Sequence, residues 1–301
     1  MKLDKYEIIL ESDLAEFPNL DMYKENLKLL KDYNFNGATP WEISEKYYHY
    51  ATIFPQAFIT QNPDRFNQHS FYRVRLNIDT NTEDINLIQT HSYPLPCFCG
   101  QNGRANLKGK SVFYCSNKPG AALFECKPKK GDEGFLSIWK PVAKRPIKFG
   151  VLLPTDLRQD NPWYELAIST FSTINDYLRA HAKDKFQHFV ELYRFIAERF
   201  IEEKEPYHLT SWLSHELIYG EKWKDLILYP SVATDKLYCN MAFHPNTVHT
   251  QLRLEKVIRF IVRDVDGGRF LYSPGQVGEP KDTNIIWRPS RPEEKDFMNL
   301  E

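Results

Sequence analysis

The chain has 301 residues, of which 42% are hydrophobic and 14% aromatic, and a formal net charge of −1 at pH 7. This length suits one large domain or one domain with an appendage. The near-neutral charge argues against direct nucleic-acid binding, because proteins that bind nucleic acids are usually basic. No apolar run approaches the roughly 18 residues that a membrane span needs, and the first residues lack a secretory signal. We therefore expect a cytoplasmic protein with no membrane role.

The first ~65 residues predict helices with capped starts, and we expect residues 1–65 to form a helical N-terminal extension. One helix is expected over residues 21–30, with Asp21 as its cap. A second is expected from Thr39, which can cap it, through Tyr50. Pro40 then occupies the first helical position, and Glu42 falls where the acid of a capping box belongs.

A run of aromatic and β-branched residues with alternating cations predicts a strand over residues 71–76. Arg73 and Arg75 are expected to share one face of it. Residues 77–84 are a polar loop. Residues 111–115 and 135–142 predict strands on either side of a short helix of small residues near 120–126.

The strongest helical signal lies between Pro162 and Glu205. Its apolar residues recur at spacings of three and four, which predicts a buried stripe. The stripe comprises Phe186, Phe189, Val190, Tyr193, Ile196, Ala197, Phe200 and Ile201.

Beyond that signal, a helix over residues 210–219 ends at Gly220, and strands are expected over 226–229 and 256–265. Pro230 breaks the first of these strands. The last ~30 residues are rich in Pro, Gly and charge, so residues 269–301 are expected to be a peripheral tail.

Five cysteines occur in an apparently intracellular chain, which favours reduced thiols over disulfides. They are Cys97, Cys99, Cys115, Cys126 and Cys239. One residue separates the first two, whereas structural zinc sites favour two to four between paired ligands. The histidines at 208, 215, 244 and 249 lack the spacing of a metal site. We therefore expect no metal.

A loop bounded by Gly103 and Gly109 carries Arg104 and leads through a predicted strand to a helix that delivers Glu125. A cation and a carboxylate joined in this way predict a pocket for a phosphorylated sugar. The loop is neither a P-loop nor a dinucleotide fingerprint, because the glycine spacing and the following element are wrong for both. By itself, it is also compatible with an ordinary hairpin loop.

Read in order, Arg73, Tyr114, Glu125 and Ser231 resemble the RES domain, a family named for its Arg, Glu and Ser. The resemblance covers roughly residues 66 to 265, although Ala105 replaces the family's usual aromatic residue. The matching segments are residues 72–74, 103–116, 121–125, 229–232 and 240–243.

The resemblance implies an α+β fold like that of ADP-ribosyltransferases, with a mixed or antiparallel β core and surrounding helices. The catalytic domain is then expected over residues 66–268, with a helical insertion at about 160–205. The resemblance also implies a toxin of a toxin–antitoxin or defence system. Its implied partners are an Xre-like antitoxin and, as in small members of the family, a second copy of the chain.

The activity that the resemblance implies is degradation of NAD⁺, by hydrolysis or by transfer of ADP-ribose to inorganic phosphate. Glu125 suits the positive character that develops on the sugar. Arg73, and secondarily Arg104, suits the pyrophosphate. Tyr114 can stack on nicotinamide or bind ribose, and Ser231 offers a hydroxyl to ribose or phosphate.

Each of these residues also has an ordinary interpretation when it is taken alone. Arg73 could be a surface cation, Glu125 a solvated helix acid, Tyr114 a core residue and Ser231 a turn residue. Two other functions therefore stay open: ADP-ribosylation of a macromolecule, and a catalytically inactive module that binds a nucleotide or a partner.

Overall fold

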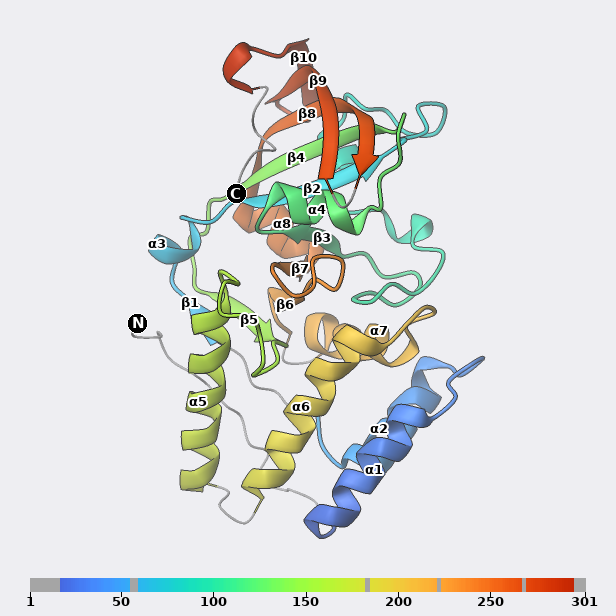
Figure 1. Cartoon of the computed structure of the whole chain (residues 1–301), viewed down its shortest axis with the longest axis vertical. Coiled ribbons are helices and arrows are strands. Elements are labelled where there is room, and N and C mark those ends of the chain that lie inside the picture. The colour runs from blue at the N-terminus through green and yellow to red at the C-terminus, as the bar shows by residue number, and fades with distance from the viewer. Residues whose placement is uncertain (1–16, 55–58, 182–184, 221–222, 267–268, 295–301) are drawn as a thin grey trace. The chain divides into compact units, whose positions relative to one another are not determined.

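The computed structural model of the chain describes residues 17–54, 59–181, 185–220, 223–266 and 269–294 (Figure 1). Within these ranges the chain forms eight α-helices and ten strands, with both parallel and antiparallel pairing. Two compact units are present. The first draws on the described residues within 17–61, 96–110 and 147–230, and the second on those within 62–95, 111–146 and 231–294. The segments of the two units alternate along the chain.

The first unit is largely helical. Its helices are α1 (Leu20–Asp32), α2 (Pro40–Ala51), α5 (Tyr164–His181), α6 (Phe186–Glu202) and α7 (His208–Tyr219). Its strands are β1 (Ile59–Gln61), β5 (Ile147–Val151) and β6 (Leu226–Pro230), in the order β1-β5-β6. Strand β5 pairs antiparallel with β1 and parallel with β6. A 3₁₀ turn, η2, covers Pro96–Phe98.

The N-terminal helices begin at side-chain caps, as the sequence indicates, but one cap is a different residue. Asn19, not Asp21, caps α1, because its Oδ1 accepts the Met22 N–H at 3.0 Å. Asp21 lies in the first turn instead, where a negative charge is also favourable. In α2 the expected capping box is confirmed, with Pro40 in the first turn.

The capping box of α2 leads to a stability prediction. The Thr39 Oγ1 accepts the Glu42 N–H at 3.3 Å, and a Glu42 carboxylate oxygen accepts the Thr39 N–H at 2.7 Å. We expect Thr39→Ala to lower the free energy of unfolding by about 1 kcal/mol, because one helix N–H loses its acceptor. Urea unfolding measures this. Glu45→Ala, on an exposed side chain of the same helix, is the control, and equal losses from both variants would contradict the prediction.

The long helical signal between Pro162 and Glu205 divides into α5 and α6. Four members of the predicted stripe are buried and four are half-buried, so half of the stripe is fully enclosed in the core. The buried members are Phe189, Ile196, Ala197 and Phe200. Helix α7 ends at Gly220, as predicted.

The second unit is built on an antiparallel sheet. In spatial order its strands are β7 (Cys239–Phe243), β3 (Phe113–Ser116), β2 (Phe71–Leu76), β4 (Glu133–Pro141), β8 (Leu252–Asp266), β9 (Arg269–Lys281) and β10 (Asn284–Pro289). The short helices α3 (Pro63–Phe66), α4 (Pro119–Glu125) and α8 (Pro245–Gln251), with the 3₁₀ turns η1 (Ile88–His91) and η3 (Pro292–Glu294), complete it. Figure 1 shows β8, β9 and β10 lying side by side.

The predicted strand boundaries are close to those observed, except at the C-terminal end of the chain. Residues 269–289, expected to belong to a peripheral tail, instead form β9 and β10. Despite their Pro and Gly content, these strands bury apolar side chains. Val277 of β9 is fully buried with Ile258 of β8 and Ile138 of β4, and Ile285 of β10 is 2% exposed. These buried apolar side chains fix the pairing register of the strands.

Helix α4 packs on one face of β2. Its Ala122 and Leu123 join Val74 and Leu136 in a buried cluster, with Tyr72 packed against it. Because successive side chains of a strand point to opposite faces, Arg73 lies on the other face of β2. Arg73 therefore lies on the face of β2 opposite to α4, the helix that ends at Glu125.

The segment after β2 contains a buried histidine, His91, which is 1% exposed. Its Nε2 bonds to the Ile85 carbonyl oxygen at 2.9 Å. Burial lowers the pKa of His91 to about 4, and the bond to Ile85 opposes the shift in part. The folded chain thus holds this imidazole neutral over a range in which the unfolded chain takes up a proton.

Because His91 is held neutral in the folded chain, we expect the free energy of unfolding to fall in acid. Since the folded pKa lies below the unfolded value of about 6.5, the stability is fully present above pH 6.5 and falls as the pH drops toward 4. Between pH 7.5 and pH 5 we expect a loss of about 2 kcal/mol from this residue. Urea unfolding at both pH values measures it. In His91→Gln the loss between the two pH values should be smaller by that amount, and an unchanged loss would contradict the prediction.

No helix in the described ranges combines the length and the apolar character needed to cross a bilayer.

Candidate functional site

Glu125 is the last residue of α4, a helix that begins with Pro119 in its first turn. Four residues of α4 are buried, among them Ala122 and Leu123, and Glu125 itself is exposed. The carboxylate therefore stands at the carbonyl end of a helix, where the helix dipole is unfavourable for negative charge. A position of this kind needs compensating hydrogen-bond donors.

Two donors from distant parts of the chain supply that compensation. Ser231 Oγ donates to Glu125 Oε1 at 2.5 Å, and Asn240 Nδ2 donates to the same oxygen at 2.7 Å. Both are short, as expected for hydrogen bonds to a charged acceptor. The other carboxylate oxygen, Oε2, makes no hydrogen bond within the described part of the chain. One oxygen is held and the other remains available.

Both donors are themselves fixed. Ser231 is fully buried, its N–H donates to the Tyr238 carbonyl oxygen at 2.9 Å, and its own carbonyl oxygen accepts the Lys236 N–H at 2.9 Å. Asn240 is 8% exposed and lies on β7, opposite Ser116 of β3. The carboxylate orientation is therefore set by the loop after β6 and by the sheet.

Tyr114 lies on the same side of the sheet as this cluster. It is two residues from Ser116 on β3, so the two side chains share a face, and Ser116 is the register partner of Asn240. The Tyr114 side chain is half-buried. The structure thus places Tyr114 on the Glu125 face, two positions along the strand.

Arg73, by contrast, lies on the opposite face of β2. Its Nη1 donates to the Tyr114 carbonyl oxygen at 3.1 Å, and its guanidinium carbon is 5.7 Å from the centre of the Phe113 ring. Burial lowers the pKa of Arg73 to about 10, and the charge of Arg75 acts in the same direction. Its Nε is buried, with no hydrogen-bond partner among the residues that the structure describes. Arg73 thus connects β2 to β3, and within the described part of the chain it forms no hydrogen bond or ion pair with Glu125.

Arg104 belongs to the first unit, whereas the other four predicted residues belong to the second. Its Nη1 donates to the Phe200 carbonyl oxygen, in the last turn of α6. Its guanidinium carbon lies 4.8 Å from the centre of the Tyr207 ring. These contacts give Arg104 a local role, in which it satisfies a carbonyl at a helix C-terminus.

The cysteines near the site are suited to packing. Burial raises the pKa of Cys126 to about 11 and that of Cys115 well above its ordinary value. Cys126 Sγ lies 3.4 Å from the carbonyl oxygens of Val74 and Ala122. Raised pKa values disfavour the thiolate, which is the form that attacks or binds metal. Within the described ranges there is no group of three or more His, Cys, Asp or Glu residues that could hold a metal ion.

Asn240 was not assigned a role from the sequence, although its segment was part of the resemblance. The available signal was a single amide in an otherwise apolar strand, Cys239–Phe243. A buried polar side chain needs a hydrogen-bond partner, and here the partner is Glu125.

Comparison with known proteins does not add to this picture: no model of a known protein family matches the chain, and no curated protein matches it.

Proposed function

We propose that the chain cleaves the nicotinamide–ribose bond of NAD⁺, with Glu125 as the catalytic carboxylate. The observation that carries the proposal is the convergence of Ser231 and Asn240 on one oxygen of Glu125. A carboxylate fixed by two buried donors, with its second oxygen available, is preorganised to stabilise positive charge that develops in a transition state.

In the proposed reaction the bond between the ribose anomeric carbon and the nicotinamide nitrogen breaks, and its electron pair neutralises the pyridinium ring. The sugar passes through a state with oxocarbenium character, as in glycoside cleavage. Glu125 Oε2 lies against that positive charge. Water then gives ADP-ribose and a proton, or inorganic phosphate gives ADP-ribose 1″-phosphate.

Tyr114 is proposed to contact the nicotinamide or the ribose, since it lies on the Glu125 face. Ser231 and Asn240 act as positioning residues, because both donate to the carboxylate. Arg73 is proposed to support β3 beneath Tyr114, because its contacts are with the Tyr114 backbone and the Phe113 ring. This role replaces the pyrophosphate contact expected for Arg73.

The antiparallel sheet of the second unit, with α4 on one face, supports the further proposal of an ADP-ribosyltransferase-like core. The resemblance to the RES domain supports a cytoplasmic toxin role in which an Xre-like antitoxin covers the site.

Product analysis tests the proposed reaction. Purified protein is incubated with NAD⁺, with and without phosphate, and the products are separated by chromatography. We expect free nicotinamide together with ADP-ribose, or with ADP-ribose 1″-phosphate when phosphate is present. Label from adenine-labelled NAD⁺ on a macromolecule would instead favour ADP-ribosylation. Intact NAD⁺ would favour the binding module.

A further inference from the structure

Two cations lie directly opposite each other on neighbouring strands of the antiparallel sheet in the second unit. Lys140 of β4 is the register partner of Arg253 of β8, and both side chains are exposed. The side chains of such a pair share one face of the sheet, with Cβ atoms about 5 Å apart, and like charges in this arrangement destabilise the pairing. An anion that binds both cations would remove the repulsion.

Several other cations of this sheet are paired with carboxylates. Three arginines form ion pairs in which the closest nitrogen and oxygen atoms are 2.6 Å apart: Arg75–Glu83, Arg259–Glu133 and Arg288–Glu294. Neither Lys140 nor Arg253 has an ion-pair partner among the residues that the structure describes. The charges of the opposed pair are therefore not compensated by a direct contact.

The opposed pair has hydrogen-bond donors to spare. Lys140 Nζ donates to Ser70 Oγ at 2.7 Å, which ties the ammonium to the residue before β2, and an ammonium carries further N–H donors. The Arg253 guanidinium makes no hydrogen bond within the described ranges, so all of its N–H donors are available. Together the two side chains can bind several oxygen atoms of one anion.

The neighbouring charges on β8 are of both signs. Lys256 is half-buried and shares a face with Lys140, because its register partner lies two residues before Lys140 on β4. Glu255 is exposed. Burial raises the pKa of Tyr72, and the negative charge of Glu255 acts in the same direction, so this carboxylate lies near the start of β2. Positive charge predominates in the group as a whole, which favours an anion with more than one negative charge.

We propose that Lys140 and Arg253 bind the dianion of a phosphate group, either as inorganic phosphate or as the end of a small phosphate monoester. The guanidinium binds two phosphate oxygens in parallel, and the ammonium binds another. A phosphate monoester carries a charge of about −1.5 to −2 at pH 7, so it compensates both cations, whereas a carboxylate compensates only one. The inference does not depend on the activity proposed for Glu125, because the two sites share no residue.

Thermal unfolding in phosphate tests the site, because a ligand that binds only the folded chain raises the midpoint of unfolding. Chloride is replaced by phosphate at pH 7.5 and constant ionic strength, and the rise of the midpoint with concentration gives an apparent Kd. Acetate, which carries one charge, should give a smaller rise. Glycerol 3-phosphate distinguishes the two sources: a Kd like that of phosphate indicates the free ion, and a Kd lower by about 10-fold or more indicates an ester.

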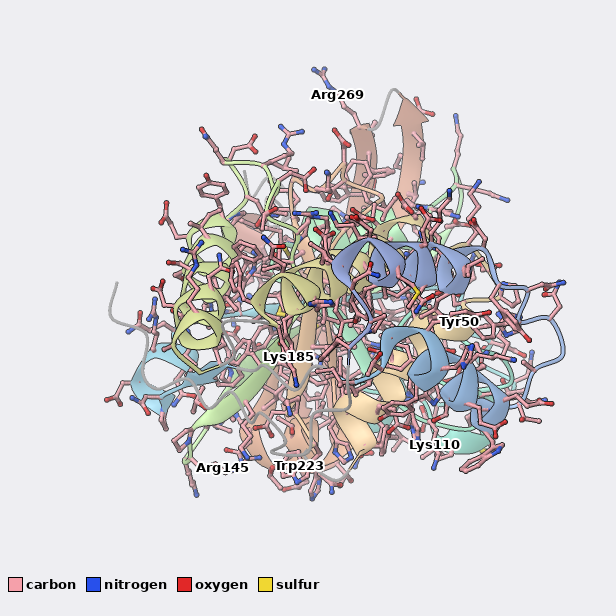
Figure 2. The ribbon with its side chains drawn as sticks, turned by 90° about the horizontal axis from the view of Figure 1, so that it is seen from below. Tyr50, Lys110, Arg145, Lys185, Trp223 and Arg269 are labelled. Carbon is pink, nitrogen blue, oxygen red and sulfur yellow. The ribbon has the colours of Figure 1, made fainter. Side chains whose placement is uncertain are left out.

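Charge variants locate the binding. We expect Arg253→Gln and Lys140→Gln each to weaken phosphate binding by about 10-fold or more, because charge-assisted hydrogen bonds are lost. In chloride alone, Arg253→Gln should unfold at no lower temperature than the unaltered chain, since the repulsion from Lys140 is removed. Arg269→Gln removes the same charge from an exposed side chain that projects from the start of β9 (Figure 2), and its phosphate binding should be unchanged.

The matched variants also separate binding from the general effect of phosphate on protein stability. Phosphate stabilises folded chains by its exclusion from their surface, and that effect acts equally on the unaltered chain and on all three variants. An equal rise of the midpoint in the four proteins would therefore overturn the proposal. A rise in phosphate no larger than the rise in acetate would overturn it as well.

Discussion

Glu125→Gln is expected to lower the rate of NAD⁺ cleavage at saturating substrate by about 10²- to 10³-fold, which is the usual effect of removing one preorganised electrostatic group. The substitution keeps the shape of the side chain, and its carbonyl oxygen can still accept from Ser231 and Asn240. The charge is lost, and an amide nitrogen replaces Oε2. The variant therefore removes the stabilisation of the sugar cation with little change in structure.

Two measurements keep this prediction specific to catalysis. The free energy of unfolding of Glu125→Gln should match that of the unaltered chain within about 0.5 kcal/mol, since the side chain is exposed. Glu255→Gln removes the same charge from an exposed position on β8 and should retain full activity. If Glu125→Gln kept more than a third of the activity, Glu125 would not be the catalytic group.

Removing either of the two positioning residues is expected to lower the rate of NAD⁺ cleavage less than removing the charge of Glu125. Ser231→Ala and Asn240→Ala each leave the carboxylate in place with one donor fewer. We expect each to lower the rate at saturating substrate by about 10-fold, because each loss corresponds to roughly one hydrogen bond. The KM for NAD⁺ should change little, since neither side chain is proposed to contact the substrate. A raised KM with an unchanged rate would place them in substrate binding instead.

Arg73→Ala is expected to lower the free energy of unfolding by about 2–4 kcal/mol. The substitution removes the hydrogen bond to the Tyr114 carbonyl oxygen and the stacking on Phe113, and it leaves a cavity between β2 and β3. Arg73→Met fills most of that space without a charge, so it should recover part of the loss. Urea unfolding measures both variants.

The outcome of this experiment distinguishes two roles for Arg73. If Arg73→Ala is as stable as the unaltered chain but inactive, Arg73 binds the substrate, as the resemblance to the RES domain implies. If Arg73→Ala is destabilised and Arg73→Met keeps most of the activity, the framework role is supported. Arg269→Ala, at an exposed position of the same unit, serves as the control for loss of a cation.

Local patterns in the sequence were sufficient to predict several elements of the fold. The strand at Phe71–Leu76 and the capping box of α2 depend on neighbours within a few residues, so their sequence patterns predicted them correctly. The cap of α1 was assigned two residues too late, because Asn19 and Asp21 both have side chains that can cap.

Contacts between distant parts of the chain determine features that local sequence patterns do not predict. Arg75, expected on a polar face with Arg73, is covered by the segment that follows β2: its Nη1 donates to the Thr90 carbonyl oxygen at 2.7 Å and to Glu83 at 2.6 Å. No periodicity within a strand reveals which loop will cover it. The sequence did predict that Glu125 and Ser231 lie in one site, and the two side chains are hydrogen-bonded although 106 positions separate them.

The most direct test of the central claim is proton NMR of NAD⁺ incubated with the purified chain and, in parallel, with Glu125→Gln. The account predicts that nicotinamide signals grow with the unaltered chain and stay at the background rate with the variant. NAD⁺ that remains intact with both proteins, or nicotinamide released equally by both, would contradict it.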